Sequence, residues 1–279
     1  MTSPDLFDRA LRRRRRDRAA ADYAAYDFLR AAMLEGLADR LDAVSREFRD
    51  VLDLGCFGGG FAPPPGARVA RLDAGFAFAR AAGGVQADED RPPFADGAFD
   101  LIVSAGVLDS VNDLPGALTL ARRMLRPDGL FLAAFVGGDS LATLRSLLLA
   151  AEADRPAARA HPRIDVRSAG DLLVRAGFAL PVADSETLEV RYRDLGRLLA
   201  DLRGMGATSL LAERPPLGRA TLARAAEGFA ERAASDGRVT ERFDLMFLTG
   251  WSPAPSQPKP ARRGSGTASL ADTLKRDRR

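Results

Sequence analysis

The sequence has little of the residue types that build metal centres, disulfides and membrane spans. Its 279 residues include one cysteine, Cys56, and one histidine, His161. A single cysteine excludes an internal disulfide and suits a reducing compartment, so we expect a cytoplasmic protein. One histidine excludes a two-histidine, one-carboxylate iron site within a monomer, and we predict no metal site. No run approaches the roughly eighteen apolar residues that a membrane helix needs.

Lysine is also scarce, because Lys259 and Lys275 are the only two among 41 basic residues. The net charge of +3 is a mild bias, and we expect no nucleic-acid partner. Five consecutive arginines, Arg12 to Arg16, form the densest charge run. They could contact a membrane surface, which would place the protein at the inner membrane, or RNA or an acidic protein. The simpler alternative is a solvated helix.

The stretch Val51 to Phe61 (VLDLGCFGGGF) is the segment around which the chain is organised. Its apolar residues predict a short buried strand, and the glycines that follow allow a sharp turn with close approach to a ligand. A second strand, Val69 to Asp73, ends in a carboxylate. A strand, a glycine-rich turn and an acid at the tip of the next strand are typical of a nucleoside-binding α/β domain, since the acid can accept hydrogen bonds from ribose hydroxyls.

Further strands predict a doubly wound α/β sheet. Val85 to Asp88, Phe99 to Ser104 and Leu130 to Val136 are apolar runs separated by turns and helical segments. Ligands bind at the carboxyl ends of such strands, so Ser104 to Asp113 should face the pocket. Within it, Asp109 is the candidate substrate contact, and a solvated loop acid or helix cap is the alternative.

Four strings, VLDLG, LDA, ADEDRPPF and FDLIVS, resemble the class I S-adenosylmethionine-dependent methyltransferases. The resemblance implies a Rossmann-like, mostly parallel seven-stranded sheet with added helices, and S-adenosylmethionine as cofactor. It also implies cofactor-binding roles. Asp53, Gly55 and Gly59 belong to the loop that receives the methionine part, Asp73 would hold the ribose, and Asp88 would face the adenine.

The chain departs from this family pattern at two places. Phe57 stands where the motif Asp-x-Gly-x-Gly-x-Gly has its middle glycine. Pro63, Pro64 and Pro65 stand where the first helix should run, and consecutive prolines remove backbone donors and clash with a helical turn. We therefore predict a short or irregular first crossover, and cofactor binding stays an open question.

A narrower resemblance covers nearly the whole chain. The strings VNDLPGAL, GGDSLATLRSLLLAAE, DLLVRAGFALPVADSETLEVRY and FLTGW are similar to the respiratory complex I assembly factor 5 family and its bacterial relatives. This implies a protein substrate, an arginine of a complex I subunit that becomes hydroxylated. Asp73, Asp88, Asp109 and Asp113 would form an acidic pocket edge able to pair with its guanidinium. Two alternatives stay open, a non-catalytic assembly factor and an ordinary methyltransferase of unknown acceptor. No catalytic residue is assigned.

The expected domain organisation follows from these patterns. Residues 1–47 would be a helical extension, and residues 48–252 a methyltransferase-like domain with a helical insertion at about 194–234. The remaining segment, 253–279, is rich in proline, serine and glycine, and is expected to be a disordered tail.

Overall fold

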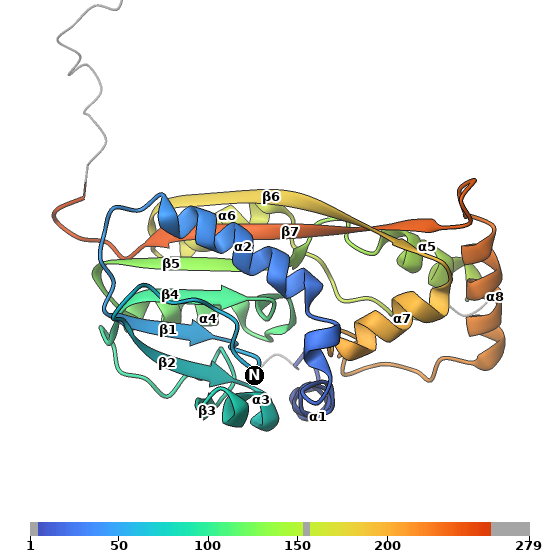
Figure 1. Ribbon diagram of the computed structural model, residues 1–279, viewed down its shortest axis with the longest axis horizontal. Coiled ribbons are helices and arrows are strands. Elements are labelled where there is room, and N and C mark those ends of the chain that lie inside the picture. The colour runs from blue at the N-terminus through green and yellow to red at the C-terminus, as the bar shows by residue number, and fades with distance from the viewer. Residues whose placement is uncertain (1–4, 153–156, 258–279) are drawn as a thin grey trace, which may run out of the picture.

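The computed structural model describes residues 5–152 and 157–257, and within them one seven-stranded sheet runs in the order β3-β2-β1-β4-β5-β7-β6. Six strands run in the same direction, and β7, which lies between β5 and β6, is antiparallel to both of its neighbours. This confirms the predicted doubly wound, mostly parallel sheet (Figure 1). The strands are β1 (Asp50–Leu54), β2 (Arg68–Asp73), β3 (Val85–Gln86), β4 (Phe99–Ala105), β5 (Leu125–Gly137), β6 (Ala179–Tyr192) and β7 (Val239–Trp251).

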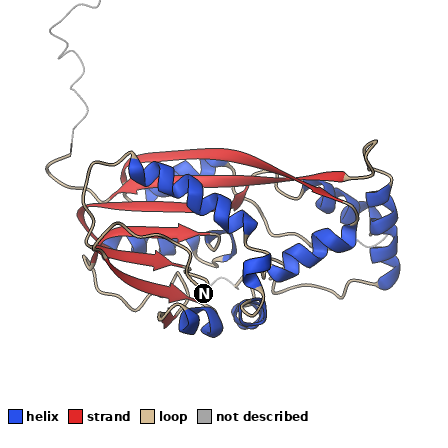
Figure 2. Cartoon of the chain, viewed as in Figure 1, coloured by secondary structure: helices blue, strands red, loops and turns tan. Residues whose placement is uncertain are grey.

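Helices cover both faces of the sheet (Figure 2). One apolar cluster contains side chains of α3, α4 and α6, and a second contains side chains of α2, α5, α7 and α8. Central strands such as β4 are therefore buried along their whole length and read as continuous apolar runs. The helices are α1 (Arg9–Ala19), α2 (Phe28–Asp42), α3 (Phe76–Ala81), α4 (Leu114–Met124), α5 (Ala142–Ala151), α6 (Val166–Arg175), α7 (Leu195–Gly204) and α8 (Arg219–Ala230), with short 3-10 turns at Tyr23–Ala25 and Leu108–Ser110.

The link between β1 and β2 contains no helix, although every one of residues 55–67 is described. Pro63, Pro64 and Pro65 lie in this link. The prediction of an irregular first crossover is confirmed, and its cause is the loss of backbone donors and the fixed φ of three successive prolines.

The last two strands are longer than their apolar runs predict. The alternating residues of Leu188 to Tyr192 indicate a five-residue strand, but β6 begins at Ala179 and pairs with β7 as far as Val239. Most of β6 is exposed edge, so its polar residues hide the strand from a search for apolar alternation. The long antiparallel pair of β6 and β7 extends beyond the rest of the sheet, and α5, α7 and α8 lie around its far end (Figure 1).

The predicted domain boundaries stay predictions. The structure places α7 and α8 between residues 194 and 234, and the predicted tail, apart from residues 253–257, lies outside the described residues. None of the helices in the described segments has the length and apolar character needed to cross a membrane.

Candidate functional site

The carboxyl ends of β1, β2 and β4 point toward one edge of the sheet, and α1 lies just beyond them (Figure 1). This edge carries the predicted cofactor residues. Gly55 and Gly59 have φ angles of +80° and +107°, which glycine adopts without steric cost. A Cβ on Gly55 would approach a methyl carbon of Val107 to 2.4 Å, so that position excludes any larger residue.

Asp73 is fully buried at the tip of β2 and has no free acceptor position left for a ligand. Its Oδ1 accepts hydrogen bonds from Arg16 Nε at 2.8 Å and from the Gly75 amide at 2.7 Å. Its Oδ2 accepts from Arg16 Nη2 and from the Phe57 amide, the latter at 2.8 Å. Burial raises the pKa of Asp73, but the charge and hydrogen bonds of Arg16 outweigh it and hold the pKa below its ordinary value. The carboxylate is therefore ionised and neutralised within the chain.

Three arginines of α1 point from one face of the helix into the sheet edge, because residues three and four apart share a helical face. Besides Arg16, Arg12 donates to both oxygens of Glu89, at 2.6 and 2.9 Å, and Arg9 donates to both oxygens of Asp90, at 2.7 and 2.6 Å. These are bidentate pairs, the strongest geometry of guanidinium and carboxylate.

The expectation that Arg12 to Arg16 form a solvated or membrane-contacting surface is wrong for two of the five. Arg12 and Arg16 are 4% and 6% exposed and lie against the protein's own acids. Arg13 also reaches inward, to Asp88 at 2.7 Å, and only Arg14 is exposed without a hydrogen-bond partner in the described chain.

The acids of the 88–90 turn were only partly anticipated. Asp88 was expected to face an adenine, but in the structure it accepts from Arg13 at 2.7 Å and from Arg9 at 3.2 Å. Glu89 and Asp90 were missed. The signal available for finding them is the match between three consecutive acids and arginines spaced at three and four residues.

Phe57 adopts a φ of +50°, in the left-handed region. Its ring is buried, stacks on Tyr23 with centroids 4.7 Å apart, and meets Phe78 edge-on at 5.2 Å. The guanidinium of Arg16 lies 4.0 Å from the ring centroid, a cation–π contact. The backbone at this position therefore keeps the conformation that a glycine would favour, while the side chain fills the space beside Asp73.

Asp53 is 1% exposed, and neither of its carboxylate oxygens has a hydrogen-bond partner among the described residues. Arg30 Nη2 stands 4.0 Å from Oδ1 but donates instead to the Cys56 carbonyl at 3.1 Å and, through Nη1, to the Gly59 carbonyl. Burial raises the pKa of Asp53 to about 6, and the positive charge of Arg30 only partly offsets this.

The other two predicted pocket acids differ from one another. Asp109 lines the small cavity at this edge and pairs with Arg163, its Oδ2 lying 3.4 Å from Nη1. Burial raises the pKa of Asp109, against the lowering effect of Arg163. Asp113 is exposed and caps α4 by accepting from the Gly116 amide at 2.8 Å, so it does not join the site.

Cys56 and His161 have no arrangement for nucleophilic or acid–base work. Burial raises the pKa of the Cys56 thiol to about 12, which leaves it protonated at neutral pH. His161 is buried in the loop before α6, and its Nε2 accepts a hydrogen bond from the Leu210 amide at 2.8 Å. Across residues 5–152 and 157–257 no group of three or more His, Cys, Asp or Glu is placed to hold a metal ion.

The site as folded does not accommodate S-adenosylmethionine. The cavity among α1, Phe57 and Asp109 measures about 70 Å³, whereas small-molecule sites need about 300 Å³ or more. Asp73, the expected ribose acceptor, is already saturated with donors. Asp53 has unused hydrogen-bonding capacity, as do Arg30 Nε and Ser104 Oγ, and its place next to the glycine turn keeps it available to a donor that enters there.

Comparisons with known proteins agree with the fold. A methyltransferase domain model matches residues 20–181. The YcgJ protein from Bacillus subtilis superposes with a TM-score of 0.56 at 15% identity, over 79% of this chain and 99% of that one, which supports the fold alone.

Two curated relatives cover nearly the full chain. The zebrafish (Danio rerio) protein named arginine-hydroxylase NDUFAF5, mitochondrial, is 36% identical over 97% of this chain and 90% of its own length. A malonyl-[acyl-carrier protein] O-methyltransferase of Laribacter hongkongensis is 32% identical over 91% of this chain and 93% of its own. With this identity over this length, and with the sheet order described above, the chain belongs to the methyltransferase-domain family and is a relative of the arginine hydroxylase NDUFAF5.

Proposed function

We propose that this protein acts on an arginine side chain of a partner protein, and that the partner is a subunit of respiratory complex I during assembly. The observation that carries the proposal is the row of carboxylates at the sheet edge, which already binds arginine side chains. Asp73, Glu89 and Asp90 each hold one guanidinium in bidentate geometry. Planar, two-point recognition of this kind selects arginine over lysine.

The arginines now in these positions belong to α1, so a partner's arginine must take the place of one of them. Arg16 is the one to be exchanged, since Asp73 is paired with Arg16 and lies on β2, the strand next to β1, which carries Asp53 and leads into the glycine turn. The relative's name, arginine hydroxylase, agrees with a guanidinium-binding site of this kind.

The test is a mass measurement on the partner. A deletion strain is complemented with the wild-type gene, with Asp73→Asn, or with Asp96→Asn, an exposed acid paired with Arg123 that serves as control. We expect a complex I subunit whose arginine peptide gains the mass of one oxygen in the wild type and the control, and lacks it in the deletion and in Asp73→Asn. This change converts a C–H bond to C–OH with release of water, and dioxygen and a two-electron reductant must be supplied from outside this chain. If no arginine of the complex differs in mass between wild type and deletion, the proposal is wrong.

A second candidate, a non-catalytic assembly factor, is favoured by the closed cavity of about 70 Å³. It predicts that complex I assembly fails in the deletion and is rescued by Asp73→Asn with no mass change on any subunit. An ordinary methyltransferase predicts transfer of label from S-adenosylmethionine to an acceptor, as the name of the Laribacter relative describes for that protein. The cytoplasmic location, with contact at the inner membrane, is part of the proposal and is tested by fractionating cells.

A further inference from the structure

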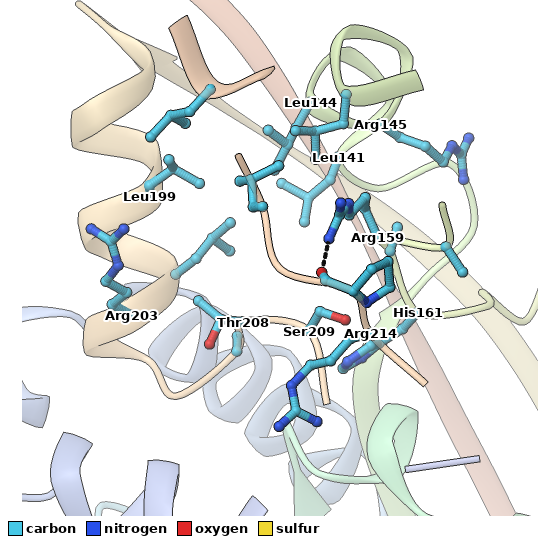
Figure 3. A pocket seen from close by; sticks show the side chains of 18 of the residues that line it. Leu141, Leu144, Arg145, Arg159, His161, Leu199, Arg203, Thr208, Ser209 and Arg214 are labelled. Atoms are coloured by element: carbon cyan, nitrogen blue, oxygen red, sulfur yellow. Dashed lines mark hydrogen bonds between the residues drawn. The ribbon is translucent and has the colours of Figure 1, made fainter. Parts of the chain in front are cut away.

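A second, larger cavity lies on the other side of His161 from the carboxylate row. It measures about 520 Å³, within the range of small-molecule sites. Side chains from α5 and α7 form two of its walls, and the segments around residues 158–163 and 207–217 close the others. Figure 3 shows Leu199 facing the cavity from α7 and Leu141 and Leu144 facing it from the opposite side.

The walls of the cavity carry leucine side chains that face open space and do not pack against the protein core. Seven leucines line the cavity, and Leu217, one of them, is 42% exposed. An open, leucine-lined cavity of this size costs free energy when it is filled with water, because each wall lacks packing partners. Such a surface is typical of a site for an apolar ligand.

The charged side chains that line the cavity have one sign. Among the described residues, the lining includes six arginines, Arg15, Arg145, Arg159, Arg163, Arg203 and Arg214, and no Asp or Glu. Four of them pair with acids outside the lining: Arg159 with Glu152, with Nε to Oε2 at 2.8 Å, Arg163 with Asp109 at 3.4 Å, Arg145 with Asp139 at 3.6 Å and Arg214 with Asp8 at 3.6 Å. The positive charge of the remaining two is not matched close by in the described chain.

Arg15 and Arg203 are the least compensated. Neither has a carboxylate within 4 Å in the described ranges, and Arg15 makes its hydrogen bond to the Ser209 carbonyl. Burial lowers the pKa of Arg15, and the neighbouring charge of Arg214 lowers it further. An anion beside Arg15 would remove both penalties.

We propose that this cavity binds an amphiphile with one alkyl chain and an anionic head, a carboxylate or a phosphate. The chain would lie among the leucines of α5 and α7, and the head would contact Arg15 at the edge. A guanidinium or a lysine would be repelled by the arginines, so the site is distinct in chemistry from the carboxylate row. The inference does not depend on the function proposed above.

The test is calorimetric titration of the full-length protein with three ten-carbon ligands: decanoate, decyl phosphate and decyltrimethylammonium. We expect the two anions to bind at least tenfold more tightly than the cation. Equal affinity for all three would show that the arginines do not recognise the head, and absence of binding by either anion would overturn the proposal.

Two matched pairs of variants locate the ligand. Leu148 on α5 lines the cavity, whereas Leu149 on the same helix is 61% exposed. We expect Leu148→Trp, which fills the cavity, to abolish decanoate binding and Leu149→Trp to leave it unchanged. Likewise, Arg15→Gln should weaken binding at least tenfold and Arg14→Gln should not. Equal effects within either pair would place the ligand elsewhere and contradict the proposal. Thermal unfolding of each variant confirms that it is folded.

The natural ligand has two sources, a free fatty acid or a single-chain membrane lysophospholipid. Native mass spectrometry after incubation with decanoate, and separately with vesicles that contain lysophosphatidylglycerol, distinguishes them by the mass that stays bound. Either retained mass supports the site. Retention of neither, with both variant pairs behaving alike, rejects it.

Discussion

Asp53 is buried without a hydrogen-bond partner in the described chain, and this makes its effect on stability depend on pH. Its pKa is about 6 in the folded protein and 3.8 by default in an unfolded chain. Between these values the folded state binds more protons than the unfolded state, so the free energy of unfolding falls as pH rises through this interval. Above about pH 6, Asp53 is ionised in the folded protein, and its destabilising effect on the free energy of unfolding is complete.

We therefore expect Asp53→Asn to stabilise the protein at pH 7 by about 2 kcal/mol, since two pKa units correspond to nearly 3 kcal/mol and the amide also lacks partners. The gain should shrink as the pH falls from 6 to 4. Urea unfolding of both proteins across this range measures it. A difference that stays constant with pH would contradict the assigned pKa. A buried carboxylate with a raised pKa beside the glycine turn favours a role in ligand binding.

His161 has the opposite effect. Burial, reinforced by Arg163, lowers its pKa from 6.5 to about 4. Between these values the unfolded state binds more protons, so stability is complete above pH 6.5 and is lost as the pH falls toward 4.

We expect His161→Gln to flatten this acid-side loss by up to about 3 kcal/mol, because glutamine can still accept from the Leu210 amide and does not titrate. Unfolding free energies at pH 7, 5.5 and 4.5 are the measurement. Parallel curves for variant and wild type would mean that another group causes the loss.

Phe57 lets the backbone conformation be tested apart from the ring. Phe57→Ala and Phe57→Gly both delete the contacts with Tyr23, Phe78 and Arg16, at a cost of about 3–5 kcal/mol. Only glycine relieves the φ of +50°. We expect the glycine variant to be about 1 kcal/mol more stable than the alanine variant, by thermal or urea unfolding. If the alanine variant is instead more stable than the glycine variant, which is the usual order of stability, the positive φ carries no strain.

Helix α1 shows which features of an element the sequence could predict and which it could not. Its helical character and its arginines are evident, but a run of five arginines looks solvated until the acids at 88–90 are placed opposite it by the fold. The sheet was predictable for the opposite reason, since β1, β2 and β4 are local apolar runs that need no distant partner to be identified. The first part of the exposed strand β6, before Leu188, and the acids Glu89 and Asp90 are not predicted from the sequence, because their structure depends on residues far away in the sequence.

The ion pairs of α1 differ in burial, so they should differ in energy. Glu89 is fully buried, and Arg12→Gln leaves it unpaired, which typically costs about 3–5 kcal/mol. Arg13 has a side chain that is 44% exposed, and Arg13→Gln should cost under about 1 kcal/mol. Adding Glu89→Gln to Arg12→Gln should recover most of the loss, because it removes the unpaired charge. Similar values for Arg12→Gln and Arg13→Gln in urea unfolding would refute this assignment.

For the whole molecule, the structure shows a state in which α1 covers Asp73, and a ligand that binds this carboxylate requires a second state in which Arg16 has left it. Any ligand that needs Asp73 binds only the second, so its apparent affinity falls by the fraction of molecules in that state. Phe57 and Arg16 together fill the space beside Asp73. Binding of S-adenosylmethionine at Asp73 therefore depends on the position of α1, which carries Arg16.

We expect Arg16→Gln to bind S-adenosylmethionine at least tenfold more tightly than the wild type, measured by calorimetry, because it frees Asp73 and weakens the closed state. Asp73→Asn in the same background should remove the gain, since it removes the acceptor that Arg16 had covered. Arg14→Gln, at an exposed position of the same helix, is the control and should match the wild type. If Arg16→Gln binds no better than the wild type, the closure by α1 is not what limits the cofactor, and Phe57 is the obstacle that remains.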